Sequence, residues 1–143
     1  MRFMVILRAT SASEAGEMPS EATITAMGNY NESLVRAGVL LAAEGLHPSR
    51  EGARVRFSGD TRDVIDGPFG DPRELVAGFW LMQVRSLDEA IEWVKRAPNP
   101  FEDGTSEIEI RRIFDADDFG PEFTVEARAQ EERLRAEVAA RSL

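Results

Sequence analysis

The chain has 143 residues, of which 43% are hydrophobic and 30% charged, so it should form one globular domain with its own core rather than a disordered segment. Its formal net charge of −9 would repel a phosphate backbone, which argues against nucleic acid as a partner. It contains no cysteine and a single histidine, which excludes disulfides and thiolate chemistry, argues against a bound zinc ion and permits a reducing compartment.

The first third of the chain predicts a strand, a helix and a second strand. The uninterrupted apolar run 3–7 is typical of a buried strand. Between a start at Pro19 and a stop at Gly38, apolar residues recur at helical spacing and predict a helix: Ile24, Met27, Leu34 and Val35. The run 39–43 follows at once and predicts the second strand.

The remaining elements begin with a hairpin, because residues 53–65 alternate in polarity around a Ser-Gly-Asp turn. Residues 75–84 predict a long strand in which Gly78 marks a bend or a close approach. A capping box at 86–89 opens a helix whose apolar face is Leu87, Ala90, Ile91 and Val94. Alternation over 107–111 predicts the last strand.

This order of elements is that of a ferredoxin-like α+β domain with an antiparallel sheet and one inserted hairpin. Two helices can cover only one face of such a sheet, so the other apolar face needs a second copy or the C-terminal segment as cover. We therefore expect a homodimer formed through the open sheet face. We assign residues 1–114 to this domain.

Residues 115–143 are expected to extend the same domain as an acidic linker and a C-terminal helix over 122–142. The apolar stripe of that helix is thin: Phe123, Ala127, Leu134 and Val138. It fits a solvated helix and equally an arm that grips a partner subunit.

No stretch of the chain approaches the ~20 apolar residues that a membrane-spanning helix requires. The N-terminal segment 1–8 has too short an apolar run for a signal peptide and lacks a small-residue cleavage site. We expect a cytoplasmic protein without a membrane partner.

Four motifs carry a resemblance to a known family: Gly45-Leu46-His47-Pro48, Asp66-Gly67-Pro68-Phe69, Gly78-Phe79 and Glu109-Ile110-Arg111. Together they resemble the YCII-related family, specifically its DGPF-containing branch, over most of residues 1–114. The resemblance implies the dimeric α+β barrel superfamily, in which two ferredoxin-like sheets pack face to face. Beyond the phenylalanine, where the branch has an acidic residue and a Lys-Glu pair, this chain has Gly70-Asp71-Pro72-Arg73-Glu74, with a proline inserted.

The sequence departs from the better-known YCII branch at a suspected acid/base pair. That branch has a histidine on the first helix and an aspartate near its end, and the corresponding positions here hold Met27 and Arg36. The resemblance also includes a member that acts on a chlorinated lactone, and relatives similar to companions of alternative sigma factors. It implies a fold more strongly than a chemistry.

The candidate catalytic residues are His47 and Asp66. An imidazole ordinarily titrates near neutrality, so a general acid/base role falls first to His47, with the Asp66 carboxylate orienting the ring. Each residue also has a structural interpretation. The histidine ring can bond to backbone just before Pro48, and an aspartate before Gly-Pro commonly caps its own turn.

The candidate substrate-binding residues are Glu44, Arg54, Arg56, Phe69, Glu74 and Tyr30. Arg54 and Arg56 share one face of the hairpin, where two guanidinium groups can hold a carboxylate. Glu44 fits a substrate clamp and equally an ion pair with either arginine. Large aromatic residues at such positions more often belong to a core than to a ligand site.

These residues support two functions. The first is a small-molecule enzyme without cofactor or metal that transfers protons, eliminates or isomerises an acidic or lactone-like compound. The second is a non-catalytic ligand-binding or regulatory dimer, linked to a sigma factor. A dry cleft with His47 and Asp66 within hydrogen-bond reach favours the enzyme, whereas exposure of both to bulk water favours the binder.

Overall fold

The computed structural model describes residues 1–101 and 104–141. They separate into two compact units, Met1–Arg112 and Ile113–Leu143, each of which is described by itself. The first unit contains β1 (Arg2–Arg8), α1 (Ser11–Glu14), α2 (Glu21–Arg36), β2 (Leu40–Gly45), β3 (Ala53–Ser58), β4 (Thr61–Asp66), β5 (Val76–Gln83), α3 (Leu87–Lys95) and β6 (Ile108–Arg112). The second contains α4 (Val125–Arg141).

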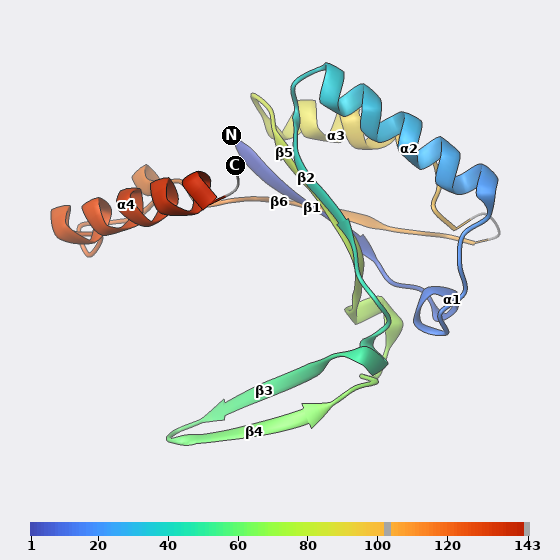
Figure 1. The fold of residues 1–143 in the computed structure, drawn as a ribbon, viewed down its shortest axis with the longest axis horizontal. Coiled ribbons are helices and arrows are strands. Elements are labelled where there is room, and N and C mark those ends of the chain that lie inside the picture. The colour runs from blue at the N-terminus through green and yellow to red at the C-terminus, as the bar shows by residue number, and fades with distance from the viewer. Residues whose placement is uncertain (102–103, 142–143) are drawn as a thin grey trace. The chain divides into compact units, whose positions relative to one another are not determined.

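Four strands form one antiparallel sheet in the order β2-β5-β1-β6, with α2 and α3 on one of its faces (Figure 1). The predicted ferredoxin-like α+β fold is therefore confirmed, including the hairpin β3-β4 between the second and third strands of the sheet. The short helix α1 lies between β1 and α2, where no element was predicted, and a capping box between Thr10 and Ser13 begins it.

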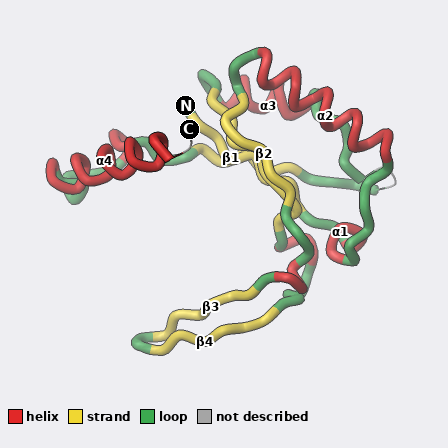
Figure 2. The backbone as a smooth tube through the Cα atoms, in the orientation of Figure 1, coloured by secondary structure: helices red, strands yellow, loops and turns green. Residues whose placement is uncertain are grey.

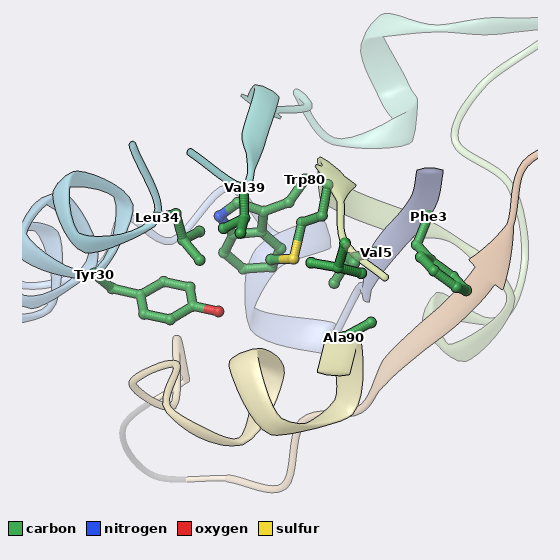
Figure 3. Packing of buried hydrophobic residues seen from close by; sticks show 9 residues of the cluster. Phe3, Val5, Tyr30, Leu34, Val39, Trp80 and Ala90 are labelled. Atoms are coloured by element: carbon green, nitrogen blue, oxygen red, sulfur yellow. The ribbon is translucent and has the colours of Figure 1, made fainter. Parts of the chain in front are cut away.

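The core lies between the sheet and these two helices (Figure 3). Its largest fully buried side chains come from β1, α2 and β5, and they are Phe3, Val5, Leu34 and Met82. The inward stripe of α2 consists of Thr23, Met27, Tyr30 and Leu34, which face the sheet. Of the four apolar residues whose spacing predicted this helix, Ile24 and Val35 lie outside the stripe and are 55% and 61% exposed.

Tyr30 joins the two helices inside this core. Its ring packs edge-on against Trp80 with centroids 6.0 Å apart, and its hydroxyl donates to the Trp93 carbonyl oxygen at 2.8 Å. Burial raises the pKa of Tyr30 to about 12, against a smaller lowering by the Arg96 charge. The neutral phenol is the form that this site accommodates.

This pKa shift gives a prediction at alkaline pH. Tyr30 is the only tyrosine, so ultraviolet absorbance of the phenolate reports on it alone. Since an unfolded tyrosine titrates near pH 10, the stability contributed by the neutral phenol is full below pH ~10 and is lost as pH rises toward ~12. The variant Tyr30→Phe should lack this loss in chemical denaturation, at a cost of about 1 kcal/mol near neutral pH. An ordinary tyrosine titration would contradict the burial.

The opposite face of the sheet carries apolar side chains without a helix above them in the described part of the first unit. They are Met4, Ile6, Ala42, Phe79 and Leu81, and we call this set the open face. A bulge in β2 inserts Leu41 between Leu40, which pairs with Met82, and Ala42, which pairs with Leu81. Leu41 is consequently 48% exposed.

The hairpin β3-β4 leaves the four-stranded sheet and forms a two-stranded sheet of its own (Figure 2). A two-residue turn containing Gly59, with φ of 54°, connects its strands. Val55, Phe57 and Val64 lie on one of its faces and are 50%, 69% and 69% exposed. An isolated two-stranded hairpin is marginally stable in water. We therefore expect this apolar face to pack against another surface.

The C-terminal unit contains an aromatic stack followed by α4. The ring of Phe119 lies 5.1 Å from that of Phe114 and 5.2 Å from that of Phe123. None of the residues of this helix is buried, and Glu131 and Arg135 form an ion pair at 2.7 Å. Among the residues that the structure describes, none of the helices has the length and apolar character needed to cross a bilayer.

Candidate functional site

The candidate site is the loop that follows β2. Leu46 donates its amide to the Ala77 carbonyl at 2.8 Å, which ties the start of the loop to β5. A short 3-10 turn, Ser49–Glu51, comes next, and the Glu51 amide donates to the Pro48 carbonyl at 3.0 Å. This turn brings the side chains of His47 and Glu51 next to each other.

His47 and Glu51 form the one imidazole–carboxylate pair within the described residues 1–101 and 104–141. Nδ1 of His47 lies 2.8 Å from Oε2 of Glu51. With the neutral imidazole donating from Nδ1, its Nε2 lone pair can accept a proton. The side chains are 84% and 53% exposed in the single subunit, so the pair faces solvent there.

Asp66 occupies a different position from the one predicted for it. It ends β4 opposite Ala53, and the carboxylate beside the imidazole is that of Glu51. The expected pairing of His47 with Asp66 is thus corrected. Sequence reasoning missed Glu51 because the 3-10 turn that closes the i, i+4 spacing was not predicted.

The Asp66–Phe69 motif packs against the same turn. Gly67 donates its amide to the Gly52 carbonyl at 3.0 Å, and Phe69 donates its amide to the Ser49 hydroxyl oxygen at 3.0 Å. A Cβ on Gly67 would lie 1.7 Å from the Ser49 carbonyl oxygen. The motif therefore forms the base of the hairpin and presses its backbone onto the turn beside His47.

The variant Gly67→Ala is expected to lower the free energy of unfolding by about 1–3 kcal/mol, the usual cost of overpacking. The added methyl group meets backbone atoms of Ser49, which cannot move aside as a flexible side chain can. Gly70→Ala is the matched control, because a Cβ there would meet nothing within 4 Å. Urea denaturation of both variants checks the difference, and equal stabilities would contradict the close packing.

The predicted substrate-binding residues occupy several places. Arg54 and Arg56 share one face of the hairpin, as expected, and the Arg54 guanidinium carbon lies 4.1 Å from the centre of the Phe69 ring. Glu44 is exposed on β2, opposite Phe79, and Glu74 is exposed at the end of a 3-10 turn.

Tyr30 lies apart from these residues. It is buried in the helix-side core, where its hydroxyl bonds to the Trp93 carbonyl oxygen. We therefore remove it from the candidate site. In the described ranges, no group of three His, Asp or Glu side chains is placed to hold a metal ion.

An ion cluster that the sequence did not predict lies at the edge of the open face. Glu109 on β6 accepts from Arg8 at 2.7 Å and from Arg111 at 3.3 Å. These hydrogen bonds, that of Arg8 foremost, lower the pKa of Glu109. Charged groups thus border the apolar centre of this face, the arrangement of an interface core with a polar rim.

Comparisons with known proteins give one family match. A family model described as the YCII-related domain matches residues 1–116. An uncharacterized protein of Rhizobium meliloti (strain 1021) is 35% identical over 79 residues, which cover 55% of this chain and 63% of that protein. The match thus spans less than two thirds of that relative's length.

A solved structure is also similar to this chain. It is the complex of 5-chloro-2-hydroxyhydroquinone dehydrochlorinase from Burkholderia phenoliruptrix AC1100 with 2,5-dihydroxybenzoquinone. The alignment covers 80% of this chain and 94% of that chain, with 17% sequence identity and a TM-score of 0.42.

Proposed function

The chain belongs to the YCII-related family, and from this premise we propose that it is a homodimeric enzyme that moves protons on a small acidic or lactone-like compound without a cofactor. The observation that carries the proposal is the His47–Glu51 pair, an imidazole held by a carboxylate at 2.8 Å. The narrower assignment to the DGPF-containing branch rests on the Asp66–Phe69 motif itself.

The open face supports the dimer. Met4, Ile6, Phe79 and Leu81 form an apolar centre on a sheet whose other face already carries α2 and α3. A two-fold interface uses the same patch on both subunits, so one such face suffices to build it. Burying this face against a second copy removes apolar area from water at a gain of roughly 25 cal/mol per Å².

The proton transfer follows from the geometry of the pair. His47 donates from Nδ1 to Glu51, and Nε2 takes a proton from a carbon next to the substrate carbonyl. The electron pair of the broken C–H bond moves into the carbonyl group as an enolate. Return of the proton to another carbon isomerises the compound, and loss of a β-substituent with its bonding pair completes an elimination.

The arginines of the hairpin supply the anchor. Arg54 and Arg56 lie on one strand face, and guanidinium groups bind carboxylates through two parallel hydrogen bonds. The Phe69 ring under Arg54 holds that side chain in place. Glu44 and Glu74 are retained as contacts to the substrate or to the partner subunit.

The test is solvent deuterium exchange, followed by NMR, on a panel of small lactones and carboxylate-bearing carbon acids. The proposal expects protein-dependent exchange at one class of carbon acid. Its absence across the panel, with a folded dimer, would overturn the enzymatic function.

Exposure favours a second candidate function, a non-catalytic ligand-binding or regulatory dimer. In the single subunit the side chain of His47 is 84% exposed and Asp66 is also exposed, which meets the criterion set above for a binder. Native mass spectrometry of the purified protein distinguishes the two functions. A retained small molecule that the protein leaves unchanged supports the binder, as does co-purification with a sigma factor.

A further inference from the structure

We infer that Glu14 and Ser49 are positioning residues for His47. Together with the Phe69 amide they form a hydrogen-bonded cluster, which we call the Ser49 latch. The inference rests on the proposed function, because it assigns the latch to the proton transfer at His47.

The contacts of Ser49 use every polar group that the residue has. Its amide donates to Oε1 of Glu14 at 3.0 Å, and its hydroxyl donates to Oε2 of the same carboxylate. The hydroxyl oxygen accepts from the Phe69 amide at 3.0 Å, and the carbonyl oxygen accepts from the Gly52 amide at 2.9 Å. Bonds to an ionised carboxylate are about twice as strong as neutral ones.

The latch joins three segments that are distant in the sequence. Glu14 ends α1 and is 35 residues from Ser49, and Phe69 is 20 residues beyond Ser49. Arg50 adds a bond from its guanidinium to the Glu14 carbonyl oxygen at 3.2 Å. The turn is therefore fixed from α1 on one side and from the base of the hairpin on the other.

The link from Ser49 to the imidazole is short and stiff. Only Pro48 separates the two residues, and its ring holds φ, which is −54° here. Glu51, the partner of the imidazole, lies on the other side of Ser49 in the same 3-10 turn. Fixing Ser49 thus fixes both members of the pair relative to each other.

Positioning of this kind matters because a shift of about 1 Å in a reacting group can lower a rate by roughly 10²-fold. In Ser49→Ala the hydroxyl disappears, and the Phe69 amide loses its acceptor. In Glu14→Gln the side chain keeps its shape, but its amide nitrogen cannot accept from the Ser49 hydroxyl. Both changes should loosen the turn while leaving His47 and Glu51 in the chain.

The experiment uses ¹⁵N NMR of the imidazole together with the exchange assay. His47 is the only histidine, so its two ring nitrogens give unambiguous signals. The intact protein should have the proton of the neutral ring on Nδ1. Ser49→Ala and Glu14→Gln should give a mixture of tautomers and a fall of about tenfold or more in kcat, with KM nearly unchanged.

Matched controls separate positioning from general destabilisation. Ser33→Ala removes a hydroxyl that bonds within α2, and Glu32→Gln removes a carboxylate that pairs with Arg36. Neither should alter the tautomer or the rate. Ser49→Thr retains a hydroxyl and should have the same tautomer and the same rate as the parent protein.

The outcomes for the latch and for the proposed function are distinct. If Ser49→Ala and Glu14→Gln leave both the tautomer and the rate as in the parent, the latch inference is overturned. If the tautomer shifts in these variants while His47→Gln exchanges as fast as the parent, the latch stands and the catalytic function falls. Should Ser49→Ala fail to fold, the isosteric Glu14→Gln decides by the same two measurements.

Discussion

The substitution His47→Gln is expected to slow the proposed deuterium exchange by about 10²–10⁴-fold, the usual contribution of a general acid or base. Glutamine retains hydrogen-bonding groups near the ring's positions but cannot take up a proton at neutral pH. Because the side chain is 84% exposed, the fold should be preserved. Rates over a series of substrate concentrations, with circular dichroism as the check on folding, measure the effect.

Two further variants assign the carboxylate that orients the imidazole. Glu51→Gln should reduce the rate, because the structure pairs this carboxylate with Nδ1 of His47. Asp66→Asn should leave it near the parent value, since Asp66 ends β4 opposite Ala53. If Asp66→Asn slowed the reaction and Glu51→Gln did not, the pairing of His47 with Asp66 that the sequence suggested would be supported instead. A parent-like rate in His47→Gln would remove this residue from the reaction.

The substitution Leu81→Asp is expected to convert the proposed dimer into a folded monomer. Leu81 lies in the centre of the open face, between Met4 on β1 and Ala42 on β2. An unpaired carboxylate buried in an interface costs about 3–5 kcal/mol, which raises the dissociation constant by more than about 100-fold. Analytical ultracentrifugation at micromolar concentration measures the change.

Val35→Asp is the matched control for this substitution. Val35 is a similar apolar side chain on α2 and is 61% exposed, so a charge there should leave the dimer intact. A parent protein that sediments as a monomer would refute the homodimer. If the Leu81→Asp variant remains dimeric, the dimer interface does not include the open face.

The sequence predicted the fold well because its signals are local. The strand over 3–7 and the helix that begins after Ser86 follow from short patterns, and the structure has both elements. Of the predicted capping box, the Ser86 hydroxyl accepts from the Glu89 amide, whereas the Glu89 carboxylate accepts from the Arg85 amide. Hydropathy failed on α2, where Thr23 and Tyr30 are buried in place of Ile24 and Val35. Both buried residues have hydrogen-bond partners, the cap residue Ser20 for Thr23 and the Trp93 carbonyl for Tyr30, and hydropathy does not register such partners.

The site was harder to predict because its contacts are long-range. The sequence singles out His47 as the only imidazole, but its carboxylate partner depends on a turn that no motif indicated. Nothing in the spacing of Glu14 and Ser49 shows that they meet. The role of Gly67 was also hidden, since only the folded chain brings the Ser49 carbonyl against it.

The extra residue in β2 determines which side of the sheet receives a negative charge. Side chains alternate along a strand, so an uninterrupted β2 would turn Glu44 toward the same side as Leu40, among the hydrophobic residues beneath the helices. With Leu41 inserted, Ala43 takes that inward position and the Glu44 carboxylate emerges on the other side. If the same residues paired with β5 in regular register, without the bulge, the strand would have to bury an anion or abandon the pairing of β2 with β5.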